Sequence, residues 1–307
     1  MSEVVAAFDC GSNSTRLLIA NDEGTTLVRA MNITRLSQGV DASGALLPEA
    51  MERTFSVLGD YRAACDLDGV TRGRLVATSA VRDASNGAVF LRRAHEIARV
   101  PAGVLAGSEE AALSYAGATK DLAPLDVPTM IVDVGGGSTE LAAELEGRLV
   151  SYSMQLGCVR ITERALGRGV VTPASDDAAR TMIDEEIARA FAARPEFEAL
   201  VGHVRLVGLA GTVATLAQMD AGLLHYDRDL VHHRVLSLET VEWWQDLLSS
   251  EPPAERLAHP GMVVGREDVL PAGLYVLDAV MRRLGVSELL SSENDILDGI
   301  VGSLLSA

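Results

Sequence analysis

Two segments of the chain combine an aspartate with glycine and serine between apolar runs. The first, DCGSNS at 9–14, follows the apolar run 4–8, and the second, DVGGGS at 133–138, follows the apolar run 129–132. Glycine has no Cβ, so the backbone can approach a phosphate closely, and successive N–H groups in such a turn bind anionic oxygens. Both segments are therefore candidates for binding phosphate groups.

The two segments also match each other in residue order. When nine residues are aligned from Asp9 and from Asp133, they share Asp, Gly, Ser, Thr and Leu at five positions, and the copies lie 124 residues apart. A match of order as well as composition predicts a duplicated strand-turn-strand unit. The alternative is two unrelated hairpin turns, since Asp, Gly and Ser favour turns by themselves.

Two carboxylates accompany the second segment. Asp133 follows the apolar run 129–132, and Glu140 lies seven residues further on, so both side chains can face the same opening. Two carboxylates beside a phosphate-binding turn suit Mg²⁺, which takes one or two carboxylates together with phosphate oxygens and waters. The chain contains neither G-x-x-x-x-G-K-[ST] nor G-x-G-x-x-G after a strand, which excludes the P-loop and Rossmann motifs.

Strand patterns alternate with helix patterns along the chain, which indicates an α/β protein. Residues 120–128 contain two prolines and no periodicity, and we interpret them as a connector between two parts. The predicted strands are 4–8, 15–20, 25–30, 73–78, 104–105, 129–132, 139–144, 204–207 and 287–291. The predicted helices are 48–65, 86–99, 108–118, 158–167, 173–192, 212–219, 239–249, 267–284 and a last one that begins near 295.

The charge balance restricts the partners of the protein. The 307 residues carry 26 basic and 43 acidic side chains, for a net charge of −17, which excludes a generally basic surface for nucleic acid. Residues 1–120 carry a net charge of −2 and residues 121–307 carry −15, so the first part is the better host for a polyanion.

Cys10, Cys65 and Cys158 are isolated and form no C-x-x-C pair, and no apolar run is long enough to span a bilayer. We expect a cytoplasmic protein that binds neither nucleic acid nor membranes.

Five ordered motifs carry a resemblance to a known family. They are DCGSNS at 9–14, TSAVR at 78–82, GSEEA at 107–111, VDVGGGSTEL at 132–141 and GLAGT at 208–212. With them the chain resembles the exopolyphosphatase / guanosine pentaphosphate phosphohydrolase (Ppx/GppA) family, which belongs to the superfamily of actin, Hsp70 and the sugar kinases. The resemblance implies two ribonuclease-H-like (actin-like ATPase) α/β domains with a cleft between them. Domain I would comprise 1–120 plus 296–307, and domain II would comprise 121–295.

The resemblance also implies roles for individual residues. Glu110 matches the catalytic base of the family, Asp133 and Glu140 match its ligands of Mg²⁺ or Mn²⁺, and Arg82 matches an arginine that contacts substrate phosphate. The other residues that match substrate- or phosphate-binding positions are Gly11, Ser12, Asn13, Gly135, Gly136, Gly137, Ser138, Gly211 and Thr212.

The implied activity is that of an exopolyphosphatase, which releases terminal orthophosphate from inorganic polyphosphate by metal-assisted hydrolysis. The alternative within the family is a guanosine pentaphosphate (pppGpp) 5′-phosphohydrolase, and a non-hydrolytic nucleotide-binding sensor or a sugar kinase is the alternative outside it. Relatives often carry Arg after Glu-Glu-Ala and a Gly-Leu-Arg-Glu-Gly run near the C-terminus, whereas this chain has Ala112 and no Arg in 292–299. The loss of both arginines predicts a preference for short chains.

Several of these residues also have an alternative interpretation in which their role is purely structural. Glu109 and Glu110 follow a predicted helix start, where the helix dipole alone favours carboxylates. Arg82 has Asp83 and Glu96 as possible ion-pair partners. His232 and His233 have no ligand partner at a useful spacing, and we interpret them as loop residues. Trp243 and Trp244 are expected to pack in the core or in a homodimer interface, and Cys10 is expected to fill a small space.

Overall fold

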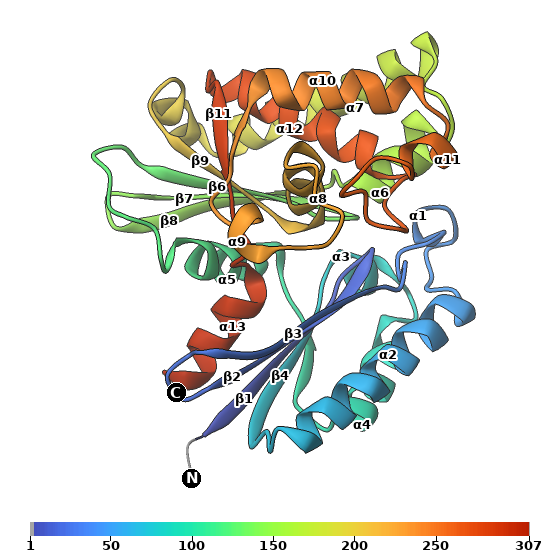
Figure 1. The fold of residues 1–307 in the computed structure, drawn as a ribbon, viewed down its shortest axis with the longest axis vertical. Coiled ribbons are helices and arrows are strands. Elements are labelled where there is room, and N and C mark those ends of the chain that lie inside the picture. The colour runs from blue at the N-terminus through green and yellow to red at the C-terminus, as the bar shows by residue number, and fades with distance from the viewer. Residues whose placement is uncertain (1–2, 307) are drawn as a thin grey trace. The chain divides into compact units, whose positions relative to one another are not determined.

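A computed structural model describes residues 3–306, which divide into two compact units (Figure 1). Unit 1 comprises the residues up to Lys120 together with those from Asp295 onward, and unit 2 comprises Asp121–Asn294. Asp295 thus groups with unit 1, one residue from the predicted boundary, because its side chain accepts a hydrogen bond from the N–H of Leu297 and caps the last helix.

The sheet of unit 1 has five strands in the order β3-β2-β1-β4-β5. The first three strands of the chain form an antiparallel meander, and β4 and β5 extend it in parallel to β1. The strands are β1 (Val4–Cys10), β2 (Ser14–Asn21), β3 (Thr26–Ile33), β4 (Arg72–Ala77) and β5 (Ala102–Val104). The helices are α1 (Val40–Ser43), α2 (Pro48–Leu67), α3 (Ser79–Asp83), α4 (Gly87–Ala98), α5 (Gly107–Thr119) and α13 (Ile296–Leu305).

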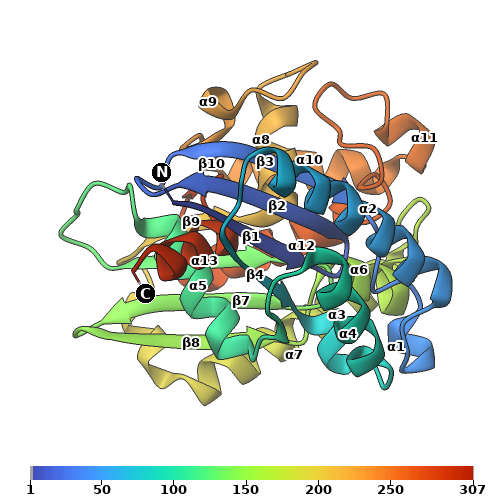
Figure 2. The ribbon, with the colours of Figure 1, turned by 90° about the horizontal axis from the view of Figure 1, so that it is seen from below.

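Helices cover both faces of this sheet (Figure 2). Alternate residues of a strand point to opposite faces. In β1, Ala6 and Phe8 therefore pack in one core with residues of α2 and α4, whereas Val5 and Ala7 pack in a second core with residues of α13. Because both faces are buried, β1 is an uninterrupted apolar run up to Asp9, where the functional loop begins.

The sheet of unit 2 repeats this arrangement with one addition. Its order is β8-β7-β6-β9-β11-β10, in which β6, β7 and β8 form an antiparallel meander and β9 and β11 follow in parallel. The short strand β10 adds an antiparallel edge. The strands are β6 (Thr129–Val134), β7 (Thr139–Leu145), β8 (Arg148–Met154), β9 (Arg205–Leu209), β10 (Val235–Ser237) and β11 (Glu288–Ser291). Strands 3-2-1-4-5 of unit 1 thus correspond to strands 8-7-6-9-11 of unit 2, and this common order confirms the predicted pair of ribonuclease-H-like units.

One large core fills unit 2. Met130, Val132 and Val134 of β6 lie in a core that also receives side chains from α7, α8, α10 and α12. The α-helices are α6 (Cys158–Ile161), α7 (Pro173–Ala193), α8 (Ala210–Asp220), α9 (Arg228–Val231), α10 (Leu238–Ser250), α11 (Pro253–Arg256) and α12 (Leu270–Leu284). A π-helical turn covers Thr162–Leu166 and a 3₁₀ helix covers Pro195–Leu200.

The predicted elements recur with a few differences. Strands β8 and β10 and the short helix α3 lie in segments for which no element was predicted. Helix α12 begins at Leu270, three residues later than predicted, with Pro271 in its first turn, where the missing N–H has no helical partner to lose. Among residues 3–306, none of the helices has both the length and the apolar character needed to cross a bilayer.

Candidate active site

The hairpin between β1 and β2 carries the first candidate phosphate loop. Asp9 lies opposite Arg16 and Cys10 lies opposite Thr15 across the two strands. The N–H of Gly11 donates to the carbonyl of Ser14 at 3.0 Å and closes the turn. A Cβ on Gly11 would lie only 3.0 Å from that same oxygen, which explains the glycine.

The hairpin between β6 and β7 has the same geometry. Asp133 lies opposite Glu140 and Val134 opposite Thr139, and the N–H of Gly135 donates to the carbonyl of Ser138 at 3.0 Å. A Cβ on Gly135 would again lie 3.0 Å from the oxygen that accepts this bond. Residues that match in the sequence repeat therefore occupy the same positions in the two hairpins. The repeat in the sequence is also a repeat in the structure.

The two hairpins differ in charge. In unit 1, Arg16 donates from Nε (2.9 Å) and Nη2 (2.6 Å) to Oδ2 of Asp9. Burial outweighs this partner and leaves the pKa of Asp9 raised. In unit 2 the position of Arg16 is taken by Glu140, so two carboxylates face each other, with 8 % of Asp133 and 1 % of Glu140 exposed.

The carboxylate pair of unit 2 fits a divalent cation. Like charges directly opposite each other destabilise an antiparallel pair of strands, so a cation between them relieves the repulsion. Hard cations such as Mg²⁺ take carboxylate oxygens, and the hydroxyl of Ser153 donates to Oε1 of Glu140 at 2.6 Å and orients it. The donor set therefore suits Mg²⁺ or Mn²⁺, whereas its counterpart in unit 1 already contains a cation, Arg16.

Backbone geometry shows where the N–H groups of the second loop point. The N–H of Cys158 at the start of α6 donates to the carbonyl of Gly135, and the N–H of Val159 donates to the carbonyl of Gly136, both at 2.9 Å. In a trans peptide the N–H of the next residue points opposite to the carbonyl. The N–H groups of Gly136 and Gly137 therefore point away from α6, and within residues 3–306 neither donates to another backbone group. They are free to hold anionic oxygens.

The first loop is supported by a segment that sequence reasoning did not identify. The carbonyl of Asn13 accepts from the N–H groups of Thr34 (3.0 Å) and Arg35 (2.9 Å), and the carbonyl of Ser12 accepts from the N–H of Ser37 (2.9 Å). Within the part of the chain that is described, Nδ2 of Asn13 and Oγ of Ser37 are buried without a hydrogen-bond partner. Buried polar groups are nearly always paired, so these two indicate a ligand at the loop. Ser12 itself shares a hydrogen bond of 2.9 Å with the hydroxyl of Ser79.

The structure brings Arg82 and Glu110 together. Nη1 of Arg82 donates to the carbonyl of Leu105 at 3.0 Å and to Oε2 of Glu110 at 3.3 Å. Nη2 of Arg82 is buried and, among the described residues, lacks a hydrogen-bond partner. An acid and a half-satisfied guanidinium side by side can hold a phosphate oxygen next to a proton acceptor.

Helix α5 separates the two acids of its first turn. The side chain of Glu109 is 47 % exposed and pairs with Arg74 at 2.6 Å, whereas that of Glu110 is 10 % exposed and faces Arg82. The structure therefore supports Glu110, the second acid, as the residue placed for chemistry. Glu96, which was a possible partner of Arg82, instead forms an ion pair with Arg93 at 3.4 Å on the exposed side of α4.

The third predicted loop, at the start of α8, is arranged differently. The guanidinium of the buried Arg266 occupies the space that a Cβ of Gly211 would need, at 1.9 Å. The hydroxyl of Thr212 is used inside unit 2, where it makes a hydrogen bond with the thiol of Cys158. Burial raises the pKa of that thiol to about 11. Arg266 is thus the charged group at this loop, and no sequence motif identified it.

Cys10 and the tryptophan pair also have clear positions. Cys10 is fully buried in the core of unit 1 beneath the first loop, as a space-filling role predicts, and burial raises the pKa of its thiol. Trp244 is buried in the core of unit 2, whereas Trp243 is 57 % exposed.

Two ribonuclease-H-like units, each with a glycine loop between its first two strands, place the protein in the class of duplicated α/β proteins with candidate phosphate loops. Comparison with known proteins narrows this class. The profile of the Ppx/GppA phosphatase family matches residues 18–307, and the chain belongs to that family.

Individual relatives cover the same length. Exopolyphosphatase 2 of Mycobacterium tuberculosis is 39 % identical over 98 % of both chains. A crystal structure of an exopolyphosphatase-like protein is 32 % identical and superposes with a TM-score of 0.90 over 99 % of both chains. The Ppx/GppA family member of Aquifex aeolicus is 26 % identical, with a TM-score of 0.80 over 100 % of this chain and 98 % of that one.

Proposed function

We propose that the protein is an exopolyphosphatase, which hydrolyses the terminal phosphoanhydride bond of inorganic polyphosphate and releases orthophosphate. Membership of a phosphatase family and the similarity to proteins named exopolyphosphatase support the reaction class. The observation that carries the proposal is the pair formed by the buried Glu110 and the half-buried Arg82, whose Nη2 lacks a partner among the described residues.

The side chains divide the work between binding and proton transfer. In unit 1, Arg82 and Asn13 hold non-bridging oxygens of polyphosphate. In unit 2, the N–H groups of Gly136 and Gly137 bind anionic oxygens. Glu110 orients the attacking water and accepts its proton as the new P–O bond forms. Asp133 and Glu140 would hold Mg²⁺ or Mn²⁺, which would supply positive charge to neutralise the phosphate oxygens. Phosphoryl transfer of this kind depends on positioning and charge stabilisation.

Replacement of Glu110 by Gln tests this assignment, because the shape is kept and proton acceptance is lost. We expect kcat on polyphosphate to fall by about 10²-fold or more, with little change in KM. Glu109→Gln is the matched control, since the neighbouring acid lies on the exposed side of the same helix turn. Retention of more than about a tenth of wild-type kcat in Glu110→Gln would exclude Glu110 as the general base.

Further features of the proposal follow from composition and exposure. Cys10, Cys65 and Cys158 are all free and buried, which fits a cytoplasmic location. The absence of two family arginines supports a preference for short polyphosphate.

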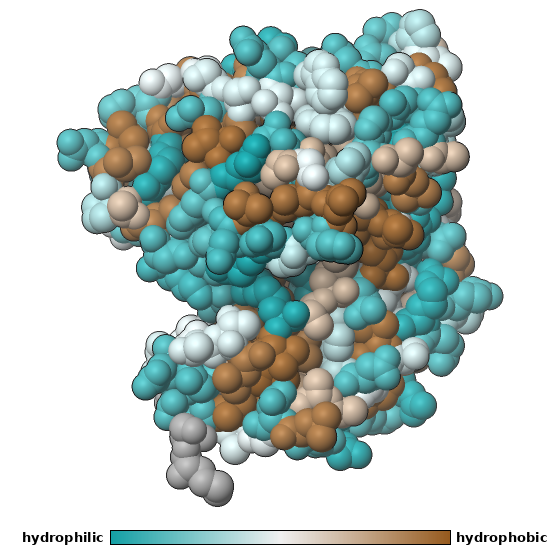
Figure 3. All heavy atoms as spheres, in the orientation of Figure 1, coloured by the Kyte–Doolittle hydropathy of each residue, from teal (hydrophilic) through white to brown (hydrophobic). Residues whose placement is uncertain are grey.

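A homodimer is also proposed, because large apolar side chains of unit 2, among them Trp243, Leu224 and Val235, are exposed. Figure 3 shows hydrophobic patches, coloured brown, between hydrophilic residues on one face of the molecule.

A further inference from the structure

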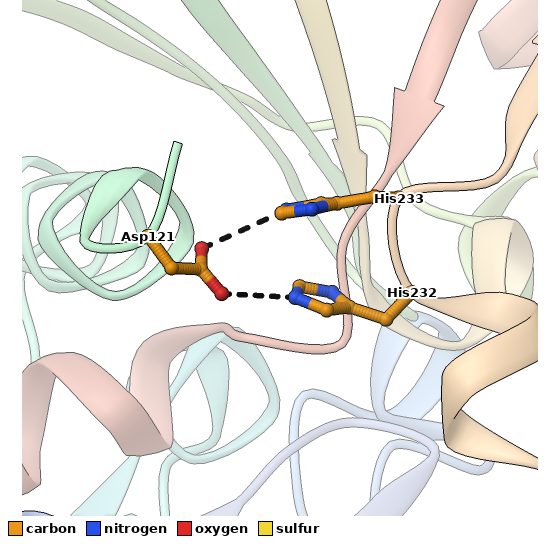
Figure 4. A group of neighbouring side chains, drawn as sticks. All are labelled: Asp121, His232 and His233. Atoms are coloured by element: carbon orange, nitrogen blue, oxygen red, sulfur yellow. Dashed lines mark hydrogen bonds and ion pairs between the residues drawn. The ribbon is translucent and has the colours of Figure 1, made fainter. Parts of the chain in front are cut away.

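A cluster of two histidines and an aspartate lies in unit 2 and contains none of the residues of the candidate phosphate loops. Sequence reasoning found no ligand partner for His232 and His233, and the structure corrects this by bringing Asp121, 111 positions away, to both rings. Figure 4 shows both imidazole rings pointing toward the carboxylate. One ligand atom from each residue lies within 4.8 Å of the other two.

One of the two separations suits a bridging cation better than a direct contact. Nε2 of His232 lies 2.9 Å from Oδ2 of Asp121, and Nε2 of His233 lies 3.6 Å from Oδ1. Two atoms that bind one tetrahedral Zn²⁺ at about 2.0–2.1 Å each are about 3.3 Å apart. The 3.6 Å gap is too long for a hydrogen bond and close to that ligand separation.

The third donor is an atom that the fold leaves unused. Nε2 of His233 is buried and, among the described residues, has no hydrogen-bond partner. The backbone of His233 is held in place, because its N–H donates to the carbonyl of Ser291 at 2.8 Å. Its ring stacks on that of His232 with centroids 3.8 Å apart. A fixed imidazole with an unpaired ring nitrogen aimed at a carboxylate is a preformed metal ligand.

A second layer of contacts orients the carboxylate. Nδ2 of Asn294 donates to Oδ2 of Asp121 at 2.7 Å, and Nη2 of Arg228 donates to Oδ1 of Asn294 at 2.7 Å. Metal-binding carboxylates are commonly held by such outer partners. Asp121 is therefore aimed at the histidines, and Asn294 contacts its Oδ2 and not its Oδ1.

We propose that Asp121, His232 and His233 bind a transition-metal dication such as Zn²⁺, in a site separate from Asp133 and Glu140. Two imidazole nitrogens and one carboxylate are a donor set that favours Zn²⁺ or Co²⁺ over Mg²⁺, with a fourth position for water. Bound metal would join the connector that contains Asp121 to the loop after α9, and so stabilise unit 2.

Metal binding requires one local rearrangement. Nδ1 of His232 accepts the N–H of Glu293 at 3.1 Å, so its Nε2 carries the hydrogen that is donated to Asp121. A metal ion replaces that hydrogen, which moves to Nδ1, and Nδ1 then ceases to accept from Glu293. The bond between Glu293 and His232 is therefore lost in the metal-bound form.

Cobalt provides the direct test, because its visible absorption reports the ligands that bind it. Co²⁺ is titrated into the full chain in the presence of excess Mg²⁺, which saturates the carboxylate pair, and Zn²⁺ is then used to displace it. We expect one equivalent of Co²⁺ to bind and to give the visible absorption typical of a Co²⁺ ion with a low coordination number. Displacement by Zn²⁺ should abolish this absorption. The affinity should fall by at least about 10–100-fold in His233→Ala and in Asp121→Asn. The exposed His203 supplies the matched control, His203→Ala, which should bind as the wild type does.

Two further measurements separate this site from the proposed active site. Asp133→Asn should leave cobalt binding unchanged, and in the wild type Zn²⁺ should speed hydrogen exchange at the amide of Glu293. Asp121→Asn keeps the shape of the side chain, so circular dichroism can show that a loss of binding is not a loss of fold. Absence of cobalt binding at 100 μM, or equal binding by His233→Ala and the wild type, would overturn the proposal.

Discussion

At the scale of single residues, the candidate phosphate loop of unit 1 contains a buried polar group that has no hydrogen-bond partner among residues 3–306. An unpaired buried donor costs about 1–3 kcal/mol, and Nδ2 of Asn13 is such a donor within the described chain. Stability alone does not account for an asparagine that is left unsatisfied in this way. A phosphate oxygen that accepts from Nδ2 does account for it.

Asn13→Ala should therefore separate binding from stability. The variant loses a hydrogen bond to a charged oxygen, worth about 1.5–3 kcal/mol, so we expect kcat/KM to fall by about 10- to 100-fold. The free energy of unfolding in urea should not fall by more than about 1 kcal/mol, because the side chain makes no hydrogen bond that folding requires and the substitution removes an unpaired donor. A drop in stability together with an unchanged kcat/KM would show that Asn13 is structural.

The carboxylates of unit 2 predict a dependence on metal. In Asp133→Asn one carboxylate of the facing pair is removed, so a higher concentration of Mg²⁺ or Mn²⁺ should be needed for half-maximal activity. Glu144→Gln is the control, because Glu144 lies on the same strand and is exposed. Full activity of the metal-stripped wild type in excess EDTA would contradict the assignment of Asp133 and Glu140.

The candidate site residues that lie in continuous motifs could be proposed from the sequence, and their chemical roles stay predictions. Asp9 and Asp133 stand at equivalent ends of β1 and β6, and Glu110 is buried whereas Glu109 is not. Ser37 and Arg266 were not predicted, because each reaches its loop through packing between segments far apart in the chain. Asp121 was missed for the same reason, since its partners lie 111 and 112 positions away.

At the scale of elements, helices α5 and α13 approach each other unusually closely. A Cβ at Gly117 would lie 1.9 Å from the carbonyl oxygen of Asp295, and one at Gly299 would lie 2.1 Å from that of Leu113. The two helices lie side by side in Figure 1 and in Figure 2. Since α5 carries Glu110, this crossing positions the proposed base.

Two glycines of α13 should respond in opposite ways to alanine. In Gly299→Ala the new methyl group would clash with the backbone of Leu113, so the substitution should destabilise the protein by about 1–3 kcal/mol. Gly302 has open space around its Cα, so Gly302→Ala should be neutral or should stabilise by up to about 1 kcal/mol. Urea unfolding of both variants measures the difference. Equal effects of the two substitutions would disprove the close crossing.

The start of α13 predicts a dependence of stability on pH. Burial by itself raises the pKa of Asp298, but the adjacent Arg29 and Lys120 outweigh it and lower the pKa below its usual value. The resulting stabilisation is present above the unfolded pKa of about 3.9 and is lost as the pH falls below it. Asp298→Asn should therefore be clearly less stable than the wild type at pH 7, and this difference should shrink below pH 4. A difference that is independent of pH would contradict the ion pairs.

Elements with a strong hydrophobic periodicity were predicted from the sequence. Elements that depend mainly on pairing or hydrogen bonding with neighbouring segments were not. The edge strands β8 and β10 pair with only one neighbour and carry polar residues, so their patterns are weak. Helix α3 has only five residues and depends on the carbonyl of Thr78, which accepts from the N–H of Arg82 at 3.0 Å. Short elements of this kind carry little periodic signal.

At the scale of the whole molecule, net charge opposes the proposed substrate. A charge of −17 repels a polyanion at long range, and a Debye length of about 10 Å at 0.1 M salt screens part of this repulsion. We expect kcat/KM to be higher for chains of a few phosphates than for chains of several hundred, and added salt to help the long chains more. A rise of kcat/KM with chain length at low salt would reveal a positive track, for which the exposed Arg92, Arg93 and Arg99 are the candidates.

The central claim is that the protein removes terminal phosphate from polyphosphate. The most direct measurement is the rate of orthophosphate release from short polyphosphate, pppGpp and ATP by the wild type, each at the same concentration and with Mg²⁺ present. We predict rapid release from polyphosphate, with chains shortened one phosphate at a time, and slow release from both nucleotides. Faster hydrolysis of pppGpp than of polyphosphate, or orthophosphate release from none of the three, would contradict that claim.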